Sequence, residues 1–321
     1  MKIFITGASG FIGGATAKHL ANTHTVFAMA RSDTAAKKVE SLGAQAVHCD
    51  LKGVEPKDLA GCEAVIHCAA YAEEWGSESD FYDSNVTATG RLLEVAKKAG
   101  ISRFIFIGTE AALFHGQDMI DVDESYPYAI RSPYPYSRTK GEAERLVLAA
   151  STSGFTALSL RPRMVWGPED QSILPAILHM IESRRFAWIG AGNYQTSTTH
   201  VANLVHAIEL ALTRGSGGNP YFIANDETMQ MRNFLTRYIE TQGVAPPNNT
   251  VPRVLARLLA RATDIAWKAL HIRRKPPLVR FSVDIMSAHC TIRTDKAKLE
   301  LGYQPVITTE AGLATMPRLT S

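Results

Sequence analysis

Short apolar runs rich in β-branched and aromatic residues recur through the first half of the chain, and helix-compatible stretches separate them. The runs lie at residues 3–5, 25–28, 46–49, 64–67, 104–107 and 157–160, and the clearest helical stretches at 86–98 and 138–150. Strands that alternate with helices form βαβ units, in which the strands run parallel and helices cover both faces. The pattern predicts an α/β fold built on a doubly wound parallel sheet.

The pattern changes near residue 165. Beyond that point the periodicity is mixed, and prolines punctuate the chain at Pro168, Pro175, Pro220 and the pair Pro246 and Pro247. Prolines mark turns and loops because they interrupt helices and central strands. We therefore predict a sheet domain over 1–165 with a returning segment near 196–225, and a smaller mixed C-terminal lobe over 166–195 and 226–321.

The composition is that of an ordinary soluble protein. The chain has 321 residues, of which 45% are apolar and 20% charged. Its first strand begins at residue 2 and no apolar run reaches the length of a membrane span, so we expect a cytoplasmic location. A net charge of +3 is too close to neutral for a nucleic-acid-binding protein. The spacing of Cys49, Cys62, Cys68 and Cys290 predicts reduced thiols and no metal site.

The turn after the first apolar run carries three glycines at intervals of three. It reads Thr6-Gly7-Ala8-Ser9-Gly10-Phe11-Ile12-Gly13. A strand that ends in such a turn and leads into a helix lets backbone N–H groups approach a pyrophosphate at the helix N-terminus. Glycine is needed because a Cβ would block that approach. The segment predicts a Rossmann-type dinucleotide site formed by Gly7, Ser9, Gly10, Phe11, Ile12 and Gly13.

A tyrosine and a lysine stand four residues apart in Tyr136-Ser137-Arg138-Thr139-Lys140, so both side chains share one helix face. A free tyrosine has a pKa of about 10, which makes it a poor general base near neutrality. A positive charge about 4 Å away, at an effective dielectric constant of about 20, is worth roughly 4 kcal/mol or about three pKa units. Lys140 is therefore predicted to lower the pKa of Tyr136 toward 7, which makes Tyr136 the candidate acid and base.

A hydroxyl follows the fifth apolar run, in Gly108-Thr109-Glu110. Ligands bind at the carboxyl ends of strands in open α/β sheets. Thr109 is thus expected to hold a substrate carbonyl oxygen beside the Tyr136 phenol; its alternative role is to cap the strand end. Glu110 is not expected to take part, because a carboxylate beside a developing alkoxide would oppose it.

Over essentially its whole length the chain resembles an extended short-chain dehydrogenase/reductase of the NAD-dependent epimerase/dehydratase superfamily. The resemblance rests on the glycine motif and on Cys49-Asp50-Leu51, His67-Cys68-Ala69-Ala70, Asn85-Val86, Tyr136 to Lys140, Arg161-Pro162 and Trp166-Gly167-Pro168. It implies that Tyr136 is the acid and base, that Lys140 holds the nicotinamide ribose, and that Thr109 stands at the family's Ser/Thr position.

The same resemblance extends the cofactor site and suggests an assembly. It places Asp50 and Leu51 beside the adenine. It adds Cys68, Ala69, Ala70 and Arg163 to the residues that bind the cofactor. In related proteins the helices near 86–99 and 138–150 form a dimer bundle, so a homodimer is an expectation that the resemblance brings.

The residues after the second apolar run favour NADP(H) over NAD(H). Family members that prefer NAD carry an acid at the end of this strand, whereas this chain reads Phe27-Ala28-Met29-Ala30-Arg31-Ser32 and reaches its first acid at Asp33. A 2′-phosphate would meet no repulsion there, and Arg31 would bind it with help from Ser32. The alternative is a solvated Arg31 in an enzyme that accepts either cofactor.

Two segments of the second lobe favour an apolar substrate over a nucleotide sugar. Nucleotide-sugar enzymes commonly carry an asparagine that contacts the substrate phosphates, and here Met164 holds that place, whose thioether cannot donate a hydrogen bond. Residues 254–270 form an amphipathic helical pattern with a basic edge. Three roles stay open for it: covering an apolar pocket, lying on an anionic membrane surface through about 253–275, or packing on its own lobe.

Together with Trp75-Gly76 and residues 276–281 and 297–305, this region resembles the 3β-hydroxysteroid dehydrogenase-like branch, which includes bacterial 2-alkyl-3-ketoalkanoate reductases. The resemblance implies an NADP(H)-dependent enzyme that interconverts a ketone and a secondary alcohol on a hydrophobic 3-keto acid, steroid-like or aromatic substrate. Two alternatives remain: a nucleotide-sugar epimerase or dehydratase that retains NAD, and a non-catalytic NADP-sensing regulator.

Overall fold

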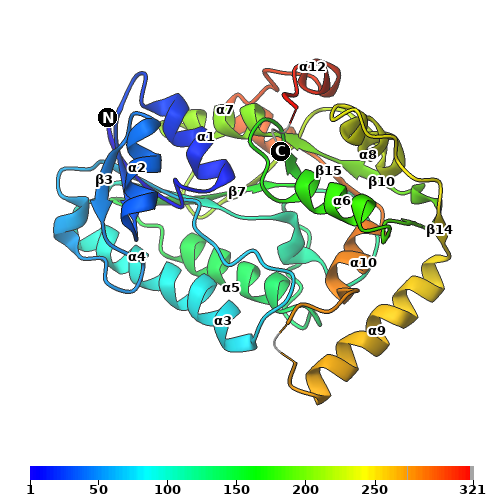
Figure 1. Ribbon diagram of the computed structural model, residues 1–321. Coiled ribbons are helices and arrows are strands. Elements are labelled where there is room, and N and C mark those ends of the chain that lie inside the picture. Colours follow the sequence, from blue (N-terminus) through cyan, green and yellow to red (C-terminus); the bar gives the residue numbers. More distant parts are fainter. Residues whose placement is uncertain (273, 319–321) are drawn as a thin grey trace.

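The computed structural model describes residues 1–272 and 274–318 and is built around a seven-stranded sheet (Figure 1). All its strands run parallel, in the order β12-β7-β5-β4-β1-β2-β3. They are β1 (Lys2–Thr6), β2 (Thr25–Ala30), β3 (Gln45–His48), β4 (Ala64–His67), β5 (Arg103–Ile107), β7 (Thr156–Pro162) and β12 (Pro220–Ile223). Each predicted apolar run coincides with one of these strands, except that the run at 46–49 extends one residue beyond β3. The predicted α/β class is confirmed.

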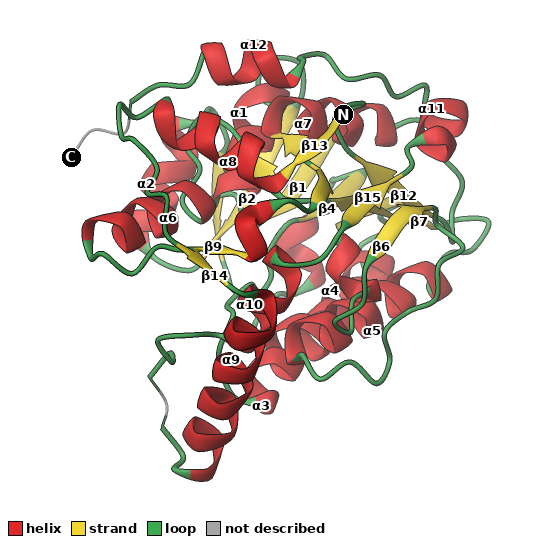
Figure 2. Ribbon diagram, turned by 90° about the vertical axis from the view of Figure 1, so that its right-hand side faces the viewer, coloured by secondary structure: helices red, strands yellow, loops and turns green. Residues whose placement is uncertain are grey.

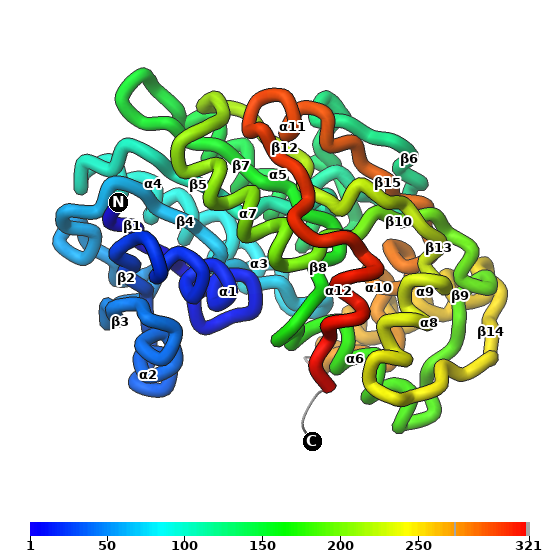
Figure 3. Tube along the Cα trace, turned by 90° about the horizontal axis from the view of Figure 1, so that it is seen from above, coloured from blue at the N-terminus to red at the C-terminus, as the bar shows by residue number. Residues whose placement is uncertain are grey.

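Helices cover both faces of this sheet, as Figures 1 and 3 show. Along β1, Ile3 and Ile5 pack into the core on one face, and Phe4 between them packs into the core on the other. The first core is completed by α1 (Phe11–Leu20), α2 (Asp33–Ser41) and α7 (Val201–Ala211), and the second by α4 (Ala88–Lys98) and α5 (Pro135–Ala149). Burial on both faces explains why the strands are almost continuously apolar.

A smaller mixed sheet forms the centre of the second lobe. Its order is β13-β10-β15-β6, with β10 antiparallel to β13 and parallel to β15. The strands are β6 (Met119–Val122), β10 (Gln195–Ser197), β13 (Thr228–Gln230) and β15 (Cys290–Ile292). Strand β6 comes from the chain between β5 and α5, yet it pairs with β15 near the end of the chain. The segment that follows β5 is thereby tied to the second lobe.

Shorter elements complete the described chain. Two strand pairs join β8 (Val165–Trp166) to β11 (Thr199–His200) and β9 (Trp188–Ile189) to β14 (Thr250–Val251). The other helices are α3 (Glu78–Tyr82), α6 (Ile173–Glu182), α8 (Met231–Glu240), α10 (Arg280–Met286), α11 (Asp295–Leu301) and α12 (Thr309–Ala314). Single turns are η1 (Pro56–Leu59), η2 (Asp83–Thr87), η3 (Glu110–Leu113) and η4 (Gly190–Gly192).

One long helix stands apart from the body. Figure 2 shows α9 (Arg253–Ala269) projecting from the second lobe beside α10. The basic segment expected over 253–275 contains residue 273, which lies outside the described residues. Within the described ranges, no helix is both long enough and apolar enough to cross a membrane.

Candidate active site

The glycine turn brings the ends of β1 and β4 into contact. Gly7 has a φ of +71°, and a Cβ on it would lie 2.7 Å from the backbone nitrogen of Ala69. A Cβ on Gly13 would lie 2.3 Å from the Gly7 carbonyl oxygen. Both positions therefore require glycine. The sheet order reverses between these two strands, which is where dinucleotides bind in doubly wound folds.

The N-terminus of α1 fits a pyrophosphate. Gly10 precedes the helix and provides no side chain to cap it. Its own N–H donates to the Gly7 carbonyl at 2.9 Å, which closes the turn. The first N–H groups of a helix have no partner within the helix, so those of Phe11, Ile12 and Gly13 are suited to the phosphate oxygens of a bound dinucleotide.

Three of the four residues predicted for the adenosine end lie together, whereas Leu51 packs against the core instead. A cavity of about 510 Å³ at the ends of β2 and β3 is lined by Arg31, Ser32 and Asp50, among others. Ser32 Oγ also caps α2 by accepting from the Ala35 N–H at 3.3 Å. Asp50 Oδ1 accepts from the N–H of Gly53 at 2.7 Å, which shapes the loop around the cavity.

Lys140 is buried in the protein interior. Its Nζ donates to the Ile107 carbonyl oxygen at 2.8 Å and lies 4.2 Å from the centre of the Phe106 ring. Burial lowers the pKa of Lys140 to about 8, against the opposing effect of Glu144. The side chain thus reaches from α5 to the end of β5, where a nicotinamide ribose is expected.

The phenol of Tyr136 differs from the sequence-based expectation. Burial raises its pKa above the ordinary value, and the charge of Glu110 raises it further, whereas a hydrogen bond with Thr109 lowers it. The predicted lowering toward 7 by Lys140 is therefore wrong for the protein alone. Because burial is the largest influence on its pKa, Tyr136 is held as a neutral phenol.

Glu110 is a member of the site that sequence reasoning set aside. It accepts a hydrogen bond from the Thr109 hydroxyl at 2.8 Å and forms a buried ion pair with Arg163 at 2.5 Å. Arg163 also donates to Thr196 Oγ1 at 3.1 Å, and its Nη2 has no acceptor among the described residues. The carboxylate is thus neutralised by Arg163 and holds the Thr109 hydroxyl.

A signal for this pair was present in the sequence. Glu110 follows β5 and Arg163 follows β7, and these are neighbouring parallel strands. Opposite charges just beyond the ends of adjacent strands are brought together by the sheet itself. Arg163 is predicted to contact the cofactor; in the structure it is 1% exposed and its guanidinium is held by Glu110 and Thr196.

Helix α10 adds an apolar wall that the sequence did not indicate. The Phe281 ring meets the Tyr136 ring edge-on at 5.7 Å between centres. Asp284 on the same helix accepts from the Tyr134 hydroxyl at 2.5 Å, two residues before Tyr136. The second lobe therefore supplies both an apolar surface beside the Tyr136 phenol and a polar anchor for the start of α5.

The segment after β4 is fastened to α5 by Asn85. Its Oδ1 accepts from the Tyr71 N–H at 2.8 Å, and its Nδ2 donates to Thr139 Oγ1 at 3.1 Å. Asn85 lies in the π-helical turn η2, a rare form that is frequent at functional sites. The Cys68–Ala70 loop and the Tyr136–Lys140 helix are thus held in a fixed relation.

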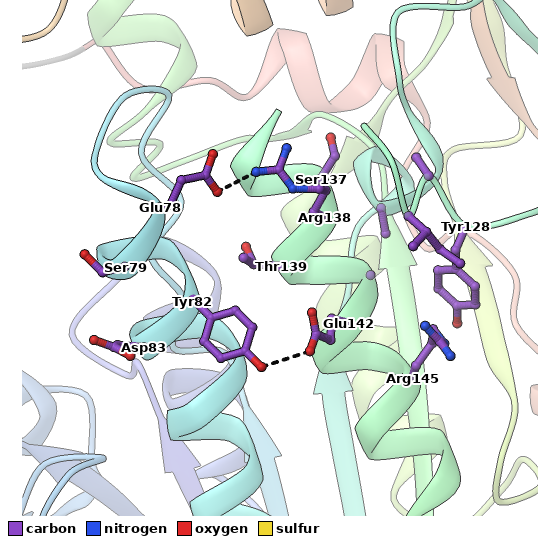
Figure 4. A pocket seen from close by; sticks show the side chains of 14 residues that line it. Glu78, Ser79, Tyr82, Asp83, Tyr128, Ser137, Arg138, Thr139, Glu142 and Arg145 are labelled. Carbon is purple, nitrogen blue, oxygen red and sulfur yellow. Dashed lines mark hydrogen bonds and ion pairs between the residues drawn. The ribbon is translucent and has the colours of Figure 1, made fainter. Parts of the chain in front are cut away.

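A separate cavity lies on the outer side of α5. It has a volume of about 410 Å³ and is shown in Figure 4, where Arg138 pairs with Glu78 and the Tyr82 hydroxyl donates to Glu142. Its lining includes neither Tyr136 nor Lys140. This cavity is therefore separate from the predicted Tyr136 and Lys140 site.

The open helix terminus, the strand reversal and the Thr109, Tyr136 and Lys140 group together define a dinucleotide-dependent oxidoreductase. The chain belongs to the NAD dependent epimerase/dehydratase family, whose model matches residues 3–224.

Relatives in this family extend over the whole chain. The chain is 38% identical over 316 residues to a 4-hydroxy-2-methyl-3-oxo-4-farnesyl-3,4-dihydroquinoline-1-oxide ketoreductase of Stigmatella aurantiaca, covering 98% of this chain and 95% of the relative. It is 30% identical over 324 residues to a 2-alkyl-3-oxoalkanoate reductase of Stenotrophomonas maltophilia, covering 98% and 97%. The resemblance to the ketoreductase and 3β-hydroxysteroid dehydrogenase-like branch is confirmed, and the chain stands among NAD(P)-dependent reductases and dehydrogenases of CH–OH and C=O groups.

Solved structures of the family share the fold. A UDP-glucuronic acid 4-epimerase from Bacillus cereus in complex with NAD superimposes with a TM-score of 0.75 at 20% identity, covering 98% of this chain and 97% of that one. At this identity the likeness concerns the fold alone. It confirms the combination of a Rossmann-type sheet with a smaller mixed lobe.

Proposed function

We propose that the protein is an NADPH-dependent ketoreductase that converts a ketone on a hydrophobic substrate to a secondary alcohol. The observation that carries the proposal is the half-buried phenol of Tyr136, which lies in hydrogen-bond reach of Thr109 and edge-on to the Phe281 ring at 5.7 Å between centres. Its raised pKa keeps it protonated. Reduction of a ketone needs a proton donor at the carbonyl oxygen, and a protonated phenol is such a donor.

Thr109, Tyr136 and Lys140 have different roles in the proposed reaction. When bound, the reduced nicotinamide supplies a hydride to the carbonyl carbon. Tyr136 donates its hydroxyl proton to the carbonyl oxygen, so that its own O–H bond breaks as the alcohol O–H bond forms. Thr109 turns its hydroxyl proton from Glu110 to the same oxygen and holds it in place. Lys140, with a pKa of about 8, is charged at neutral pH and stabilises the phenolate that remains.

The preference for NADP(H) rests on Arg31. Its exposed guanidinium lines the cavity at the end of β2 together with Ser32, and the strand ends without an acid. We expect Arg31→Ala to weaken NADPH binding about tenfold to a hundredfold, the range for one or two charge-assisted hydrogen bonds, and to leave NADH binding unchanged. Fluorescence titration of both cofactors measures this.

The matched control for Arg31 is Lys57→Ala. Lys57 lines the same cavity but pairs with Glu55 at 2.6 Å, so its loss should change the affinity for both cofactors little. Equal affinities of the unaltered protein for NADPH and NADH, or an unchanged preference in Arg31→Ala, would contradict the assignment.

The apolar surroundings of Tyr136 support a hydrophobic substrate. Phe281 lies against the phenol, and Met164 packs at the edge of an apolar cluster in the second lobe. The ketoreductase relative is named for a substrate with a 3-oxo group and a farnesyl chain. We therefore favour a bulky, lipid-like ketone over a nucleotide sugar.

We also propose a homodimer through the outer faces of α4 and α5. The exposed apolar side chains Leu146 and Tyr82 lie on this side of the molecule, and Tyr82 lines the cavity of Figure 4. Light scattering on the purified protein measures the assembly, and a monomer at micromolar concentration would contradict it.

Oxidation of NADPH against a panel of ketones tests the activity. The panel contains 3-keto acids, keto steroids, aromatic ketones and prenylated ring ketones, and we expect turnover of at least one bulky apolar member. Turnover of UDP- or dTDP-sugars with retained NAD would instead identify an epimerase or dehydratase. Cofactor binding without turnover of any ketone would favour a regulator that senses NADP.

A further inference from the structure

Helix α9 turns its apolar side toward solvent. Its large side chains are more than half exposed at Val254 (70%), Leu258 (57%) and Ile265 (68%), and so is Leu270 (69%) just beyond its end. The buried residues of the helix are Ala256 and Ala260. A surface helix ordinarily directs its large apolar residues to the core, so α9 is inverted.

Specific contacts hold the helix in this orientation. Ala260 packs in a small cluster with Val283 of α10. On the inner side, Arg257 Nε lies 2.9 Å from Asp284 Oδ1, and Arg253 lies 3.1 Å from Asp118. Arg253 and Arg257 thus turn toward the protein, whereas the leucines face outward. Packing of the apolar face on its own lobe, one of the three expected roles, is therefore wrong.

The outward face is broad and continuous. At 100° per residue, nine apolar residues cover roughly 160° of the helix surface. They are Val254, Leu255, Leu258, Leu259, Ala262, Ile265, Ala266, Ala269 and Leu270. Cations border one side of this face, where Arg261 and Lys268 lie on the helix. Arg274 and Lys275 follow the helix in the sequence, and Lys275 pairs with Glu74.

We propose that α9 docks the protein on a lipid bilayer that contains anionic lipids. A helix with a wide apolar face and a cationic border lies in the plane of the membrane interface, with its apolar side among the acyl chains and its cations at the headgroups. Asp264 is the one acid between residues 253 and 275, and it pairs with Lys268 at 3.0 Å. Glu74 pairs with Lys275 in the same way, so each of these two acids is matched by a cation.

A second copy of the chain fits this face less well. An antiparallel symmetric pair would join the same patch of each copy and bring the two cationic borders toward one another. A two-helix seam is also narrower than the apolar face of α9. Figure 2 shows the helix standing out from the body, where an extended flat surface can reach it.

The docking helix is two contacts away from the catalytic phenol. Arg257 of α9 pairs with Asp284 of α10, which accepts from Tyr134. One turn earlier on α10, Phe281 lies against Tyr136. A ketone dissolved in the bilayer would therefore enter the site close to where the protein is held. This delivery role rests on the proposed ketoreductase function, whereas the docking itself does not.

Sedimentation with vesicles tests the docking on the full chain. We expect binding to vesicles of phosphatidylcholine mixed with phosphatidylglycerol, weakened by salt and by the absence of phosphatidylglycerol. Leu258→Asn with Ile265→Asn should lower the partition coefficient at least tenfold. Arg261→Gln should lower it severalfold on the mixed vesicles only. The control is Leu299→Asn, an exposed leucine of α11, which should bind as the unaltered protein does.

The outcomes separate the docking from its rivals. Failure of the unaltered protein to bind either vesicle, or undiminished binding by the double variant, would overturn the proposal. A vesicle-free dimer that the double variant dissociates would overturn it in favour of a second copy. Thermal melts of each variant establish that it is folded. None of these measurements requires turnover, so a failed ketoreductase assay would not affect the docking result. A failed docking assay would likewise not affect the proposed ketoreductase activity.

Discussion

Helices α5 and α9 are similar in length. Both depart from ordinary amphipathic packing, but in opposite ways. Helix α5 buries charge: Lys140 and Glu144 both lie in the protein interior. Helix α9 exposes large apolar side chains, among them Leu258 and Ile265. An ordinary helix places charge outside and large apolar residues inside.

The difference shows that an unusual placement of charged or apolar side chains can be interpreted only when the residues that contact them are known. The charges of α5 are held by neighbours: Lys140 by the Ile107 carbonyl and Glu144 by Arg161 at 2.6 Å. The apolar face of α9 has no such neighbour among the described residues. Features that lower stability persist in proteins where function requires them, so α5 indicates internal chemistry and α9 indicates an external partner.

The largest effect is expected from Tyr136→Phe on α5. Removal of one hydroxyl takes away the proton donor, so the turnover number should fall about a thousandfold or more while NADPH affinity is nearly kept. Steady-state kinetics and a cofactor titration measure the two quantities. Tyr82→Phe on α3 is the control and should keep its rate. A near-normal rate in Tyr136→Phe would contradict the assignment of Tyr136, on α5, as the proton donor.

The second effect concerns the buried charge of Glu144. Glu144→Ala leaves the Arg161 guanidinium buried without its carboxylate, which should lower the free energy of unfolding by about 3–5 kcal/mol. Glu142→Ala, two residues away on the exposed side of the same helix, should cost under about 1 kcal/mol. Urea denaturation compares them. Equal losses in the free energy of unfolding would mean that water reaches the buried side of α5.

The third effect is a dependence of reduction on pH. Below about pH 8, Lys140 is protonated and Tyr136 keeps its proton, so both residues are in the active form. As the pH rises through about 8, Lys140 loses its charge while Tyr136, whose pKa is raised, stays protonated. We expect kcat/KM for ketone reduction to be flat at neutral pH and to fall about tenfold per unit above 8. A rate that stays constant to pH 10 would contradict this assignment.

The sequence predicted the parts of the fold that local rules govern. The apolar runs located β1 to β5 and β7 because strands buried on both faces have few polar positions, and the glycine spacing located the turn at Gly7. Other features depend on residues distant in sequence. Strand β6 pairs with β15 across the two lobes. The pKa of Tyr136 follows from burial and from Glu110, neither of which its spacing from Lys140 reveals.

The orientation of α9 was also beyond local rules, and the smallest expected effect tests it. Periodicity establishes that a helix is amphipathic but not which side faces the protein. Leu258→Ala on α9 should change the free energy of unfolding by less than about 0.5 kcal/mol in vesicle-free buffer. Leu92→Ala on α4, where the side chain is fully buried, should cost about 2–5 kcal/mol. A loss at Leu258 close to that at Leu92, growing with protein concentration, would show that another copy of the chain covers this face. A loss near zero leaves the face free for the bilayer, because a side chain already in water has little packing to lose on truncation.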